Sequence, residues 1–289
     1  MGSVQALPVY IAMTFMRASA RLYRAFVANQ VSVVLLVFLA FARPSEVSAA
    51  GAAPANPELE NVLTVSRQRI EKLDYRITGR ITQLGADGKQ TSYKFLAKAH
   101  WFPDGLRVLS VFSGPGSDKT SILLHMSANG RLTIEAMRPG EKTATPLAPE
   151  HWNDPLLGTD FSYDDMVESQ FFWKGQEMQA PEKYGARDCF VLKSVPGTQD
   201  RSPYDSVTSW IDRKILFPVY VVKTIHGTGQ RKEFVSYDLR QVDGVWSASQ
   251  VQAKLEGKSG SSRMIIENGT GKARLSLKDF TIGQPQEKK

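Results

Sequence analysis

Short segments of alternating apolar and polar residues fill most of the sequence after residue 74, and they constrain the fold more than any other feature. Alternation with a period of two is typical of strands that bury one face. Asp-Gly and Asn-Gly pairs separate several of these segments, and glycine supplies the positive φ that tight hairpin turns need. The sequence therefore predicts consecutive antiparallel strands joined by short turns.

The predicted strands fall into two groups, separated by an irregular, Pro-rich stretch at residues 145–166. The first group covers residues 75–84, 91–102, 106–113, 121–127 and 131–137. The second group covers residues 186–196, 206–213, 218–226, 232–242, 245–256, 262–268 and 272–282. About ten to twelve strands with two helices in one domain predict a mainly β (α+β) fold, built on a large, strongly curved antiparallel sheet.

Two segments have the features of helices. Over residues 57–73 Asn56 can cap the helix, Pro57 suits its first position, and the apolar side chains recur on one face. Those apolar residues are Leu59, Val62, Leu63, Ile70 and Leu73. The second predicted helix covers residues 162–173, where Ser162 and Asp165 match the spacing of a capping box. It ends in a cluster of bulky apolar side chains, more than a short surface helix needs.

The first fifty residues differ from the rest of the chain. A basic stretch with three arginines between residues 17 and 24 precedes an uninterrupted apolar run at 31–42, and small residues follow around Ala50. This order is typical of a secretory signal peptide, and the run is shorter than the roughly 20 residues of a membrane helix. An uncleaved membrane anchor is the alternative. We expect a cleaved signal peptide at 1–50, one domain at 51–283 and a flexible tail at 284–289.

The predicted signal peptide accounts for much of the basic character of the chain. The chain has 36 Lys and Arg and 29 Asp and Glu; the first fifty residues hold four and one of these, which leaves 32 and 28. This balance is ordinary for a protein surface, so we expect no binding to nucleic acid. The single cysteine, Cys189, excludes an internal disulfide, and its place in an alternating segment predicts a buried structural thiol.

No motif in the sequence indicates catalysis. Residues 113–121 look like a phosphate-binding loop, but Asp118 stands where that motif needs glycine and no strand–loop–helix context follows. The four histidines stand singly, without the spacing of metal ligands. His151 near Asp154 and Asp160 is the only hint of a hydrolase. We therefore predict that the protein is not an enzyme and needs no cofactor.

The acids at the start of the second predicted helix raise the question of a metal site. Asp164 and Asp165 would need further hard ligands to hold calcium, and only Asp154 and Asp160 lie nearby in the sequence. Acids in a first helical turn also interact favourably with the helix dipole. This second interpretation needs no metal, and we predict none.

Several segments taken together resemble the LolA-like superfamily of outer-membrane lipoprotein-sorting proteins. They are the helix at 57–73 and the stretches "LLGTDFSYDDM", "SWIDRKILFPVYVV" and "YDLRQVDGVW". The resemblance covers roughly residues 57–282 and is closest to an uncharacterised, spirochaete-type subgroup. It implies a half-barrel: a strongly curved antiparallel sheet whose concave face is covered by helices and holds acyl chains.

The resemblance implies a periplasmic carrier or binding protein for lipid or lipoprotein acyl chains, in transfer toward the outer membrane of a Gram-negative bacterium. The implied partners are an inner-membrane transporter and an outer-membrane acceptor. The alternative is a non-catalytic envelope adaptor or stress sensor that works with an inner-membrane exporter. The residues expected to form the lid and the cavity are Phe161, Met166, Phe171, Phe172, Trp173, Trp101, Phe112, Leu124, Trp210, Tyr220 and Trp246. For each of them, plain core packing is the competing interpretation.

Overall fold

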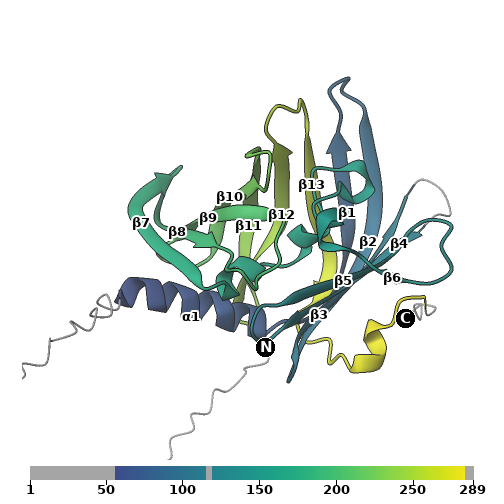
Figure 1. Cartoon of the computed structure of the whole chain (residues 1–289), viewed down its shortest axis with the longest axis horizontal. Coiled ribbons are helices and arrows are strands. Elements are labelled where there is room, and N and C mark those ends of the chain that lie inside the picture. The colour runs from purple at the N-terminus through teal and green to yellow at the C-terminus, as the bar shows by residue number, and fades with distance from the viewer. Residues whose placement is uncertain (1–55, 115–118, 284–289) are drawn as a thin grey trace, which may run out of the picture. The chain divides into compact units, whose positions relative to one another are not determined.

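The computed structural model describes residues 56–114 and 119–283 (Figure 1). The predicted signal peptide at 1–50 and the predicted tail at 284–289 lie outside these ranges. The helices are α1 (Pro57–Glu71) and the 3-10 helices η1 (Pro149–His151), η2 (Leu156–Gly158), η3 (Asp164–Met166), η4 (Ser169–Phe172) and η5 (Leu277–Phe280). None of the helices in the described ranges is long and apolar enough to span a bilayer.

The strands are β1 (Asp74–Leu84), β2 (Gln90–Phe102), β3 (Gly105–Ser113), β4 (Lys119–Ser127), β5 (Leu132–Met137), β6 (Thr145–Pro146), β7 (Gly175–Tyr184), β8 (Arg187–Val195), β9 (Tyr204–Asp212), β10 (Pro218–Ile225), β11 (Arg231–Val242), β12 (Val245–Leu255) and β13 (Ser261–Thr270). All of them belong to one antiparallel sheet in the order β6-β5-β4-β3-β2-β1-β13-β12-β11-β10-β9-β8-β7. The sheet is curved and unclosed, with β6 and β7 at its edges (Figure 1). This confirms the predicted fold class.

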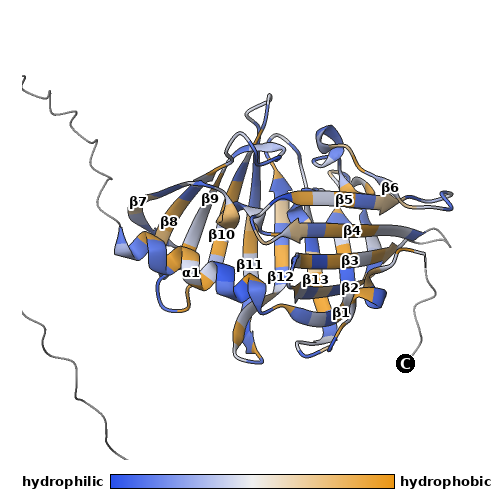
Figure 2. Cartoon of the chain, turned by 60° about the horizontal axis from the view of Figure 1, so that its bottom comes forward, coloured by the Kyte–Doolittle hydropathy of each residue, from blue (hydrophilic) through white to orange (hydrophobic). Residues whose placement is uncertain are grey.

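The sheet consists of two meanders that meet where β1 pairs with β13. The register of this pair shifts between Thr78 and Gly79. Gly79 is required there, because a Cβ atom would overlap the carbonyl oxygen of Ile265 and the ring of Phe95. Along the strands, hydrophobic and hydrophilic residues alternate in bands, as expected when one face is buried (Figure 2).

The segment between β6 and β7 has to run from one edge of the sheet to the other. We call this segment, residues 147–174, the strap. It lies over the concave face: Gln83 of β1 donates to the carbonyl oxygen of Gly158 at 2.7 Å, and Ser262 of β13 donates to Asp160 at 2.7 Å. The strand order and these two hydrogen bonds together place this segment across the middle of the sheet.

Helix α1 has the predicted start and the predicted buried face. The side chain of Asn56 accepts hydrogen bonds from the backbone N–H groups of Glu58 and Leu59, at 3.1 and 3.2 Å. Val62, Leu63 and Ile70 are buried in the main core. The helix runs beneath the sheet in Figure 1 and contacts β3, β7 and η4. Together, α1 and the strap cover the concave face.

The predicted helix at 162–173 is wrong. The segment forms two short 3-10 helices, η3 and η4, and the backbone between them is not helical at Val167 (φ −137°, ψ 159°) or Glu168 (φ −106°, ψ 56°). The Ser162 N–H does donate to the carboxylate of Asp165 at 2.9 Å, as a capping box requires. However, that carboxylate also binds groups on the sheet, so tertiary contacts override the local preference for a helix.

Two strand predictions also need correction. Strand β7 was not expected, because its residues are mostly polar and include Pro181. It is an edge strand, where one side of the backbone needs no partner and proline is tolerated. The predicted strand at 272–282 is not a strand: Asp74 accepts hydrogen bonds from the backbone N–H groups of Arg274 and Leu275, and η5 follows. These bonds turn the chain out of the sheet after β13.

Candidate functional site

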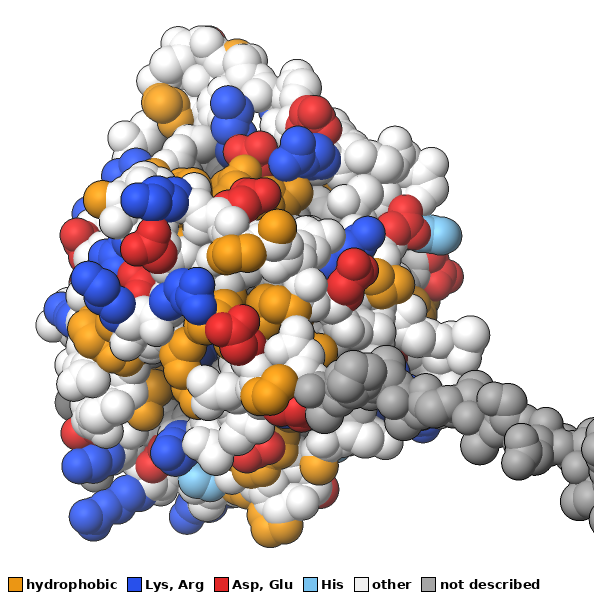
Figure 3. All heavy atoms as spheres, turned by 90° about the vertical axis from the view of Figure 1, so that its left-hand side faces the viewer, with side chains coloured by type: hydrophobic (Ala, Val, Ile, Leu, Met, Phe, Trp, Pro, Cys, Tyr) orange, Lys and Arg blue, Asp and Glu red, His pale blue; other side chains and the backbone are white. Residues whose placement is uncertain are grey.

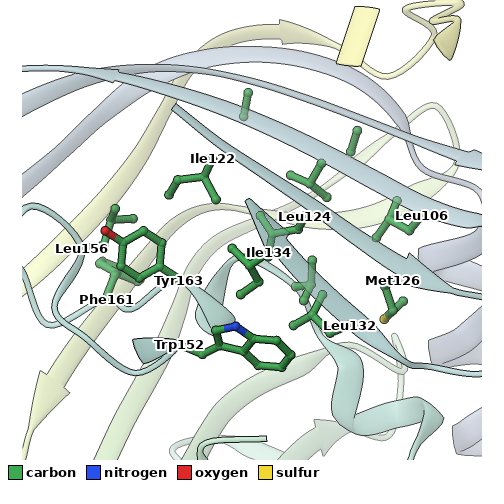
Figure 4. Packing of buried hydrophobic residues seen from close by; sticks show 14 of the residues in the cluster. Leu106, Ile122, Leu124, Met126, Leu132, Ile134, Trp152, Leu156, Phe161 and Tyr163 are labelled. Carbon is green, nitrogen blue, oxygen red and sulfur yellow. The ribbon is translucent and has the colours of Figure 1, made fainter. Parts of the chain in front are cut away.

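The strap fills one half of the concave face with side chains. Figure 4 shows Trp152, Leu156, Phe161 and Tyr163 packed against residues of β3, β4 and β5. The strand residues in this cluster are Leu106, Ile122, Leu124, Met126, Leu132 and Ile134. The indole N–H of Trp152 donates to the carbonyl oxygen of Leu147 at 2.9 Å, so even the polar atom of this ring is satisfied. This half is a packed core.

The other half of the concave face contains a cavity of about 660 Å³. It lies between the C-terminal part of α1, residues 165–170 of the strap, and the inner faces of β1 and β10–β13, and it reaches Leu106 and Val108 of β3 at the border with the packed half. Its apolar walls include Ile70, Leu73, Val221, Val251, Met264 and Ile266. Cavities that bind small ligands typically have volumes of about 300–1,000 Å³ and mostly apolar walls. By size and chemistry, this cavity is the candidate functional site.

Among the residues expected to form the lid and cavity, Met166 and Trp246 line this cavity. Phe161, Phe112 and Leu124 lie in the packed core. Four more of the expected residues do not line the cavity. Phe171 and Trp173 of the strap are buried, and Phe172 of the strap stacks on Trp101 of β2 with a centroid distance of 5.9 Å.

Trp210 and Tyr220 lie on the opposite, convex face. Tyr220 neighbours the cavity-lining Val221 in the same strand, and successive side chains of a strand point to opposite faces. The rings of Trp210 and Tyr220 contact each other with a centroid distance of 4.8 Å. The indole N–H of Trp210 donates to Glu182 at 2.8 Å. Cys189, also predicted to be buried, is buried in β8.

A buried group of ionised and polar side chains fastens the strap to the sheet. The carboxylate of Asp165 accepts hydrogen bonds from Lys223 of β10 at 2.8 Å, Lys232 of β11 at 3.0 Å and the Tyr204 hydroxyl of β9 at 2.7 Å. We call these four residues the ionic cluster. The side chain of Asp165 is fully buried, and those of the two lysines are 7% and 4% exposed.

The charges of the ionic cluster hold one another in their ionised forms. Burial by itself would raise the pKa of Asp165, but Lys223 and Lys232 outweigh burial and hold that pKa below its usual value. In the same way, burial would lower the pKa of Lys223, and the carboxylates of Asp165 and Asp164 raise it. Asp165 therefore bonds the strap to three neighbouring strands.

Asp164 differs from the adjacent Asp165 in its contacts and in the direction of its pKa shift. It is 2% exposed, its Oδ1 atom has no hydrogen-bond partner within residues 56–114 and 119–283, and its Oδ2 atom lies 3.9 Å from the Lys223 Nζ. Burial raises the pKa of Asp164 to about 6; Lys223 opposes this rise and Asp165 adds to it. The folded protein therefore holds a proton on this carboxyl group more tightly than the unfolded chain does, and releases it as the pH rises through about 6.

The D164N variant tests this assignment through the pH dependence of stability. A raised pKa stabilises the folded state at a pH below the unfolded value of about 4, and this contribution is lost as the pH rises through about 6. Asparagine has no such loss, so the free energy of unfolding of D164N relative to that of the wild type should rise by about 2 kcal/mol between pH 4.5 and pH 7.5. Urea denaturation at both pH values measures this, with the exposed-site variant E60Q as the control. Equal pH profiles for D164N and the wild type would contradict it.

Sequence reasoning missed the two lysines of the ionic cluster. Lys223 follows Val219 and Val221 at the inward positions of β10, and Lys232 shares the inward face of β11 with Phe234. Lysine at an inward position of two consecutive predicted strands was the available signal. Buried lysines need carboxylate partners, so they point to the two adjacent acids in the strap.

The groups that hinted at hydrolysis or calcium binding are not gathered in one place. The His151 Nδ1 atom lies 3.0 Å from the Asp154 Oδ2 atom, whereas the carboxylate of Asp160 accepts a hydrogen bond from Ser262 of β13. Asp165 is bound to the lysines. Within the described residues, no group of three or more His, Cys, Asp or Glu side chains has the geometry of a metal site.

Comparison with known proteins agrees with this architecture. A family model described as "Uncharacterized protein" matches residues 106–284, more than half of the chain. No curated protein matches the sequence. Three solved structures are similar along nearly their whole length. An outer membrane lipoprotein-sorting protein domain from Vibrio parahaemolyticus has a TM-score of 0.65 and 20% identity, with 77% of this chain and 97% of that one covered.

A DUF1329 family protein from Desulfovibrio piger gives a TM-score of 0.65 at 14% identity, over 78% of this chain and 97% of that one. A LolA superfamily protein from Nitrosomonas europaea gives 0.60 at 15% identity, over 77% and 97%. At these identities the structures establish the shared fold. The chain belongs to the family of the matched model, and it has the same fold as these three structures, one of which is described as a LolA superfamily protein.

Proposed function

We propose that this protein binds the acyl chains of a lipid or lipoprotein in its cavity and carries them through the periplasm toward the outer membrane. The observation that carries the proposal is the apolar cavity of about 660 Å³ beneath α1 and the strap. Protein interiors are close-packed, with few voids larger than a water molecule. A hollow of this size with apolar walls suits a hydrocarbon chain.

The energetics favour such a ligand. Each methylene group moved from water to an apolar site contributes about 0.8 kcal/mol, so ten of them contribute about 8 kcal/mol before the cost of ordering the chain. The fold supports the same interpretation, because one solved protein with this fold is named for lipoprotein sorting. In this proposal Met166 and Trp246 contact the bound chain, an inner-membrane transporter supplies it, and an outer-membrane acceptor receives it. No catalytic step is involved.

Filling the cavity tests the proposal directly. Val251 points into the cavity from β12, and a V251W variant would occupy the space of the chain. Protein purified gently from the periplasm should carry acyl lipid, detected by native mass spectrometry and lipid extraction, and V251W should carry at least about tenfold less. The matched control is K254W, which places the same ring at an exposed position of the same strand.

Two results would contradict the proposal. One is a wild-type protein that has the mass of the bare chain and does not take up a fluorescent acyl probe. The other is an equal lipid content in V251W and K254W, with V251W still folded by circular dichroism. The second result would place any lipid outside the cavity.

A further inference from the structure

Charged side chains line part of the cavity wall, and almost all of them have partners of opposite charge. Glu168 pairs with Arg69 at 2.7 Å, and Asp165 pairs with Lys223 and Lys232 in the ionic cluster. Each of these charges faces a charge of opposite sign, and Asp164, whose Oδ2 atom lies 3.9 Å from the Lys223 Nζ, offsets part of the second lysine charge. The deeper wall of the cavity is therefore suited to an uncharged hydrocarbon.

The border of the cavity has a different balance of charge. Lys72 lies at the C-terminal end of α1, and Arg240 lies on β11 close to the β11–β12 hairpin; both line the cavity and both are exposed. Among the described residues, neither forms an ion pair. The neighbouring Lys272 is paired with Asp243 at 3.2 Å. Two positive charges without acidic partners thus remain at this border.

Apolar groups stand beside these two cations. Val242 at the end of β11 is 37% exposed, and the half-buried Val245 and Trp246 follow across the hairpin. On the face drawn in Figure 3, by comparison, Lys and Arg side chains are interspersed with Asp and Glu, and hydrophobic side chains lie in the hollows between them. The border at Lys72 and Arg240 therefore combines apolar surface with an excess of one sign.

We propose that the cavity selects acyl chains that end in an anionic head group, and that Lys72 and Arg240 hold this group at the border. The inference rests on the proposed function, because the chain must enter the cavity for its head to reach these residues. An acyl chain that fills the apolar interior leaves its polar end at the opening. A phosphate or carboxylate there gains ion pairs with these cations, whereas an uncharged hydroxyl head gains only weaker hydrogen bonds.

The experiment compares three ligands with the same chain: hexadecyl phosphate, hexadecanoate and the uncharged hexadecanol. Each displaces a fluorescent acyl probe from the delipidated wild-type protein at low salt and pH 7.5. We expect both anionic ligands to bind about tenfold more tightly than hexadecanol, and the difference to shrink in 0.5 M salt. The double variant K72Q/R240Q should lose the preference and keep its affinity for hexadecanol. The control variant K254Q, which changes an exposed lysine of β12, should keep both the anionic preference and the affinity for hexadecanol.

The outcomes separate this inference from the proposed function. Equal, tight binding of all three ligands would overturn the head-group selection and leave acyl-chain binding intact. An anionic preference that survives in K72Q/R240Q would overturn the assignment to these two residues. If none of the three ligands displaces the probe, or the probe itself does not bind, the proposed function fails and the inference fails with it.

Discussion

The free energy of unfolding of a D165A variant is expected to be about 3–5 kcal/mol lower than that of the wild type at neutral pH. Removing this carboxylate leaves Lys223 and Lys232 in the protein interior without the carboxylate that both of them contact. It also removes the acceptor of the Tyr204 hydroxyl. Urea denaturation followed by tryptophan fluorescence measures the loss. Because the pKa of Asp165 is lowered, the stabilisation by its carboxylate is present above about pH 4 and disappears on acidification below that value.

Two further variants show whether the loss comes from buried charge. E58A removes an exposed ion pair with Arg213 and should cost less than about 1 kcal/mol. The triple variant D165L/K223M/K232M replaces the charges with apolar groups and should be more stable than D165A, because an uncompensated buried charge costs more than an apolar substitute. If D165A and E58A were equally stable, the ionic cluster would not be what fastens the strap.

The second large effect is expected for W152A, at about 3–5 kcal/mol of lost stability. Trp152 is the largest fully buried side chain of the strap and packs on the inner face of β4 and β5 (Figure 4). Its replacement leaves a void, and it removes the hydrogen bond to the carbonyl oxygen of Leu147.

A matched substitution on the other face provides the control. W210A removes the same side chain from the convex face, where it is half-buried and bound to Glu182, and should cost about 1–2 kcal/mol. Thermal and urea unfolding of both variants measure the difference. If the two losses were equal, the strap would not be part of the folded core. Because residues 165–170 of the strap form part of the cavity wall, W152A is also expected to lower the amount of bound lipid.

The sequence predicted the meanders well, because the strand signals are local. Alternation and Asp-Gly or Asn-Gly turns mark each hairpin, and the Asn56–Pro57 pair marks the start of α1. Strand β7 escaped prediction because an edge strand has little burial to impose a pattern. The helix expected at 162–173 failed for the opposite reason. Its local signals are present, but Asp165 is bound to residues on β9, β10 and β11, which no local pattern records.

The candidate site was harder to predict than the fold. Aromatic residues of the strap were expected to face a ligand, and most of them fill the half of the concave face that is packed solid. The cavity lies in the other half, where smaller side chains such as Val251 and Ala248 line the wall. Large side chains such as Trp246 line it too, so residue size does not mark the hollow; the space left unfilled between the strands does. That depends on how distant strands are arranged, and the sequence alone does not show it.

The pairing of β1 with β13 has a consequence for how the chain folds. It joins Arg76 to Thr270, positions near opposite ends of the domain, and it lies at the centre of the sheet. Each meander can form from local hairpins as soon as its own residues are available. The two halves cannot join until the last strand has emerged, and bringing such distant residues together is slow. A chain cut short before β13 would therefore expose two unpaired strand edges, β1 and β12, in the middle of its hydrophobic interior, and aggregation is its expected fate.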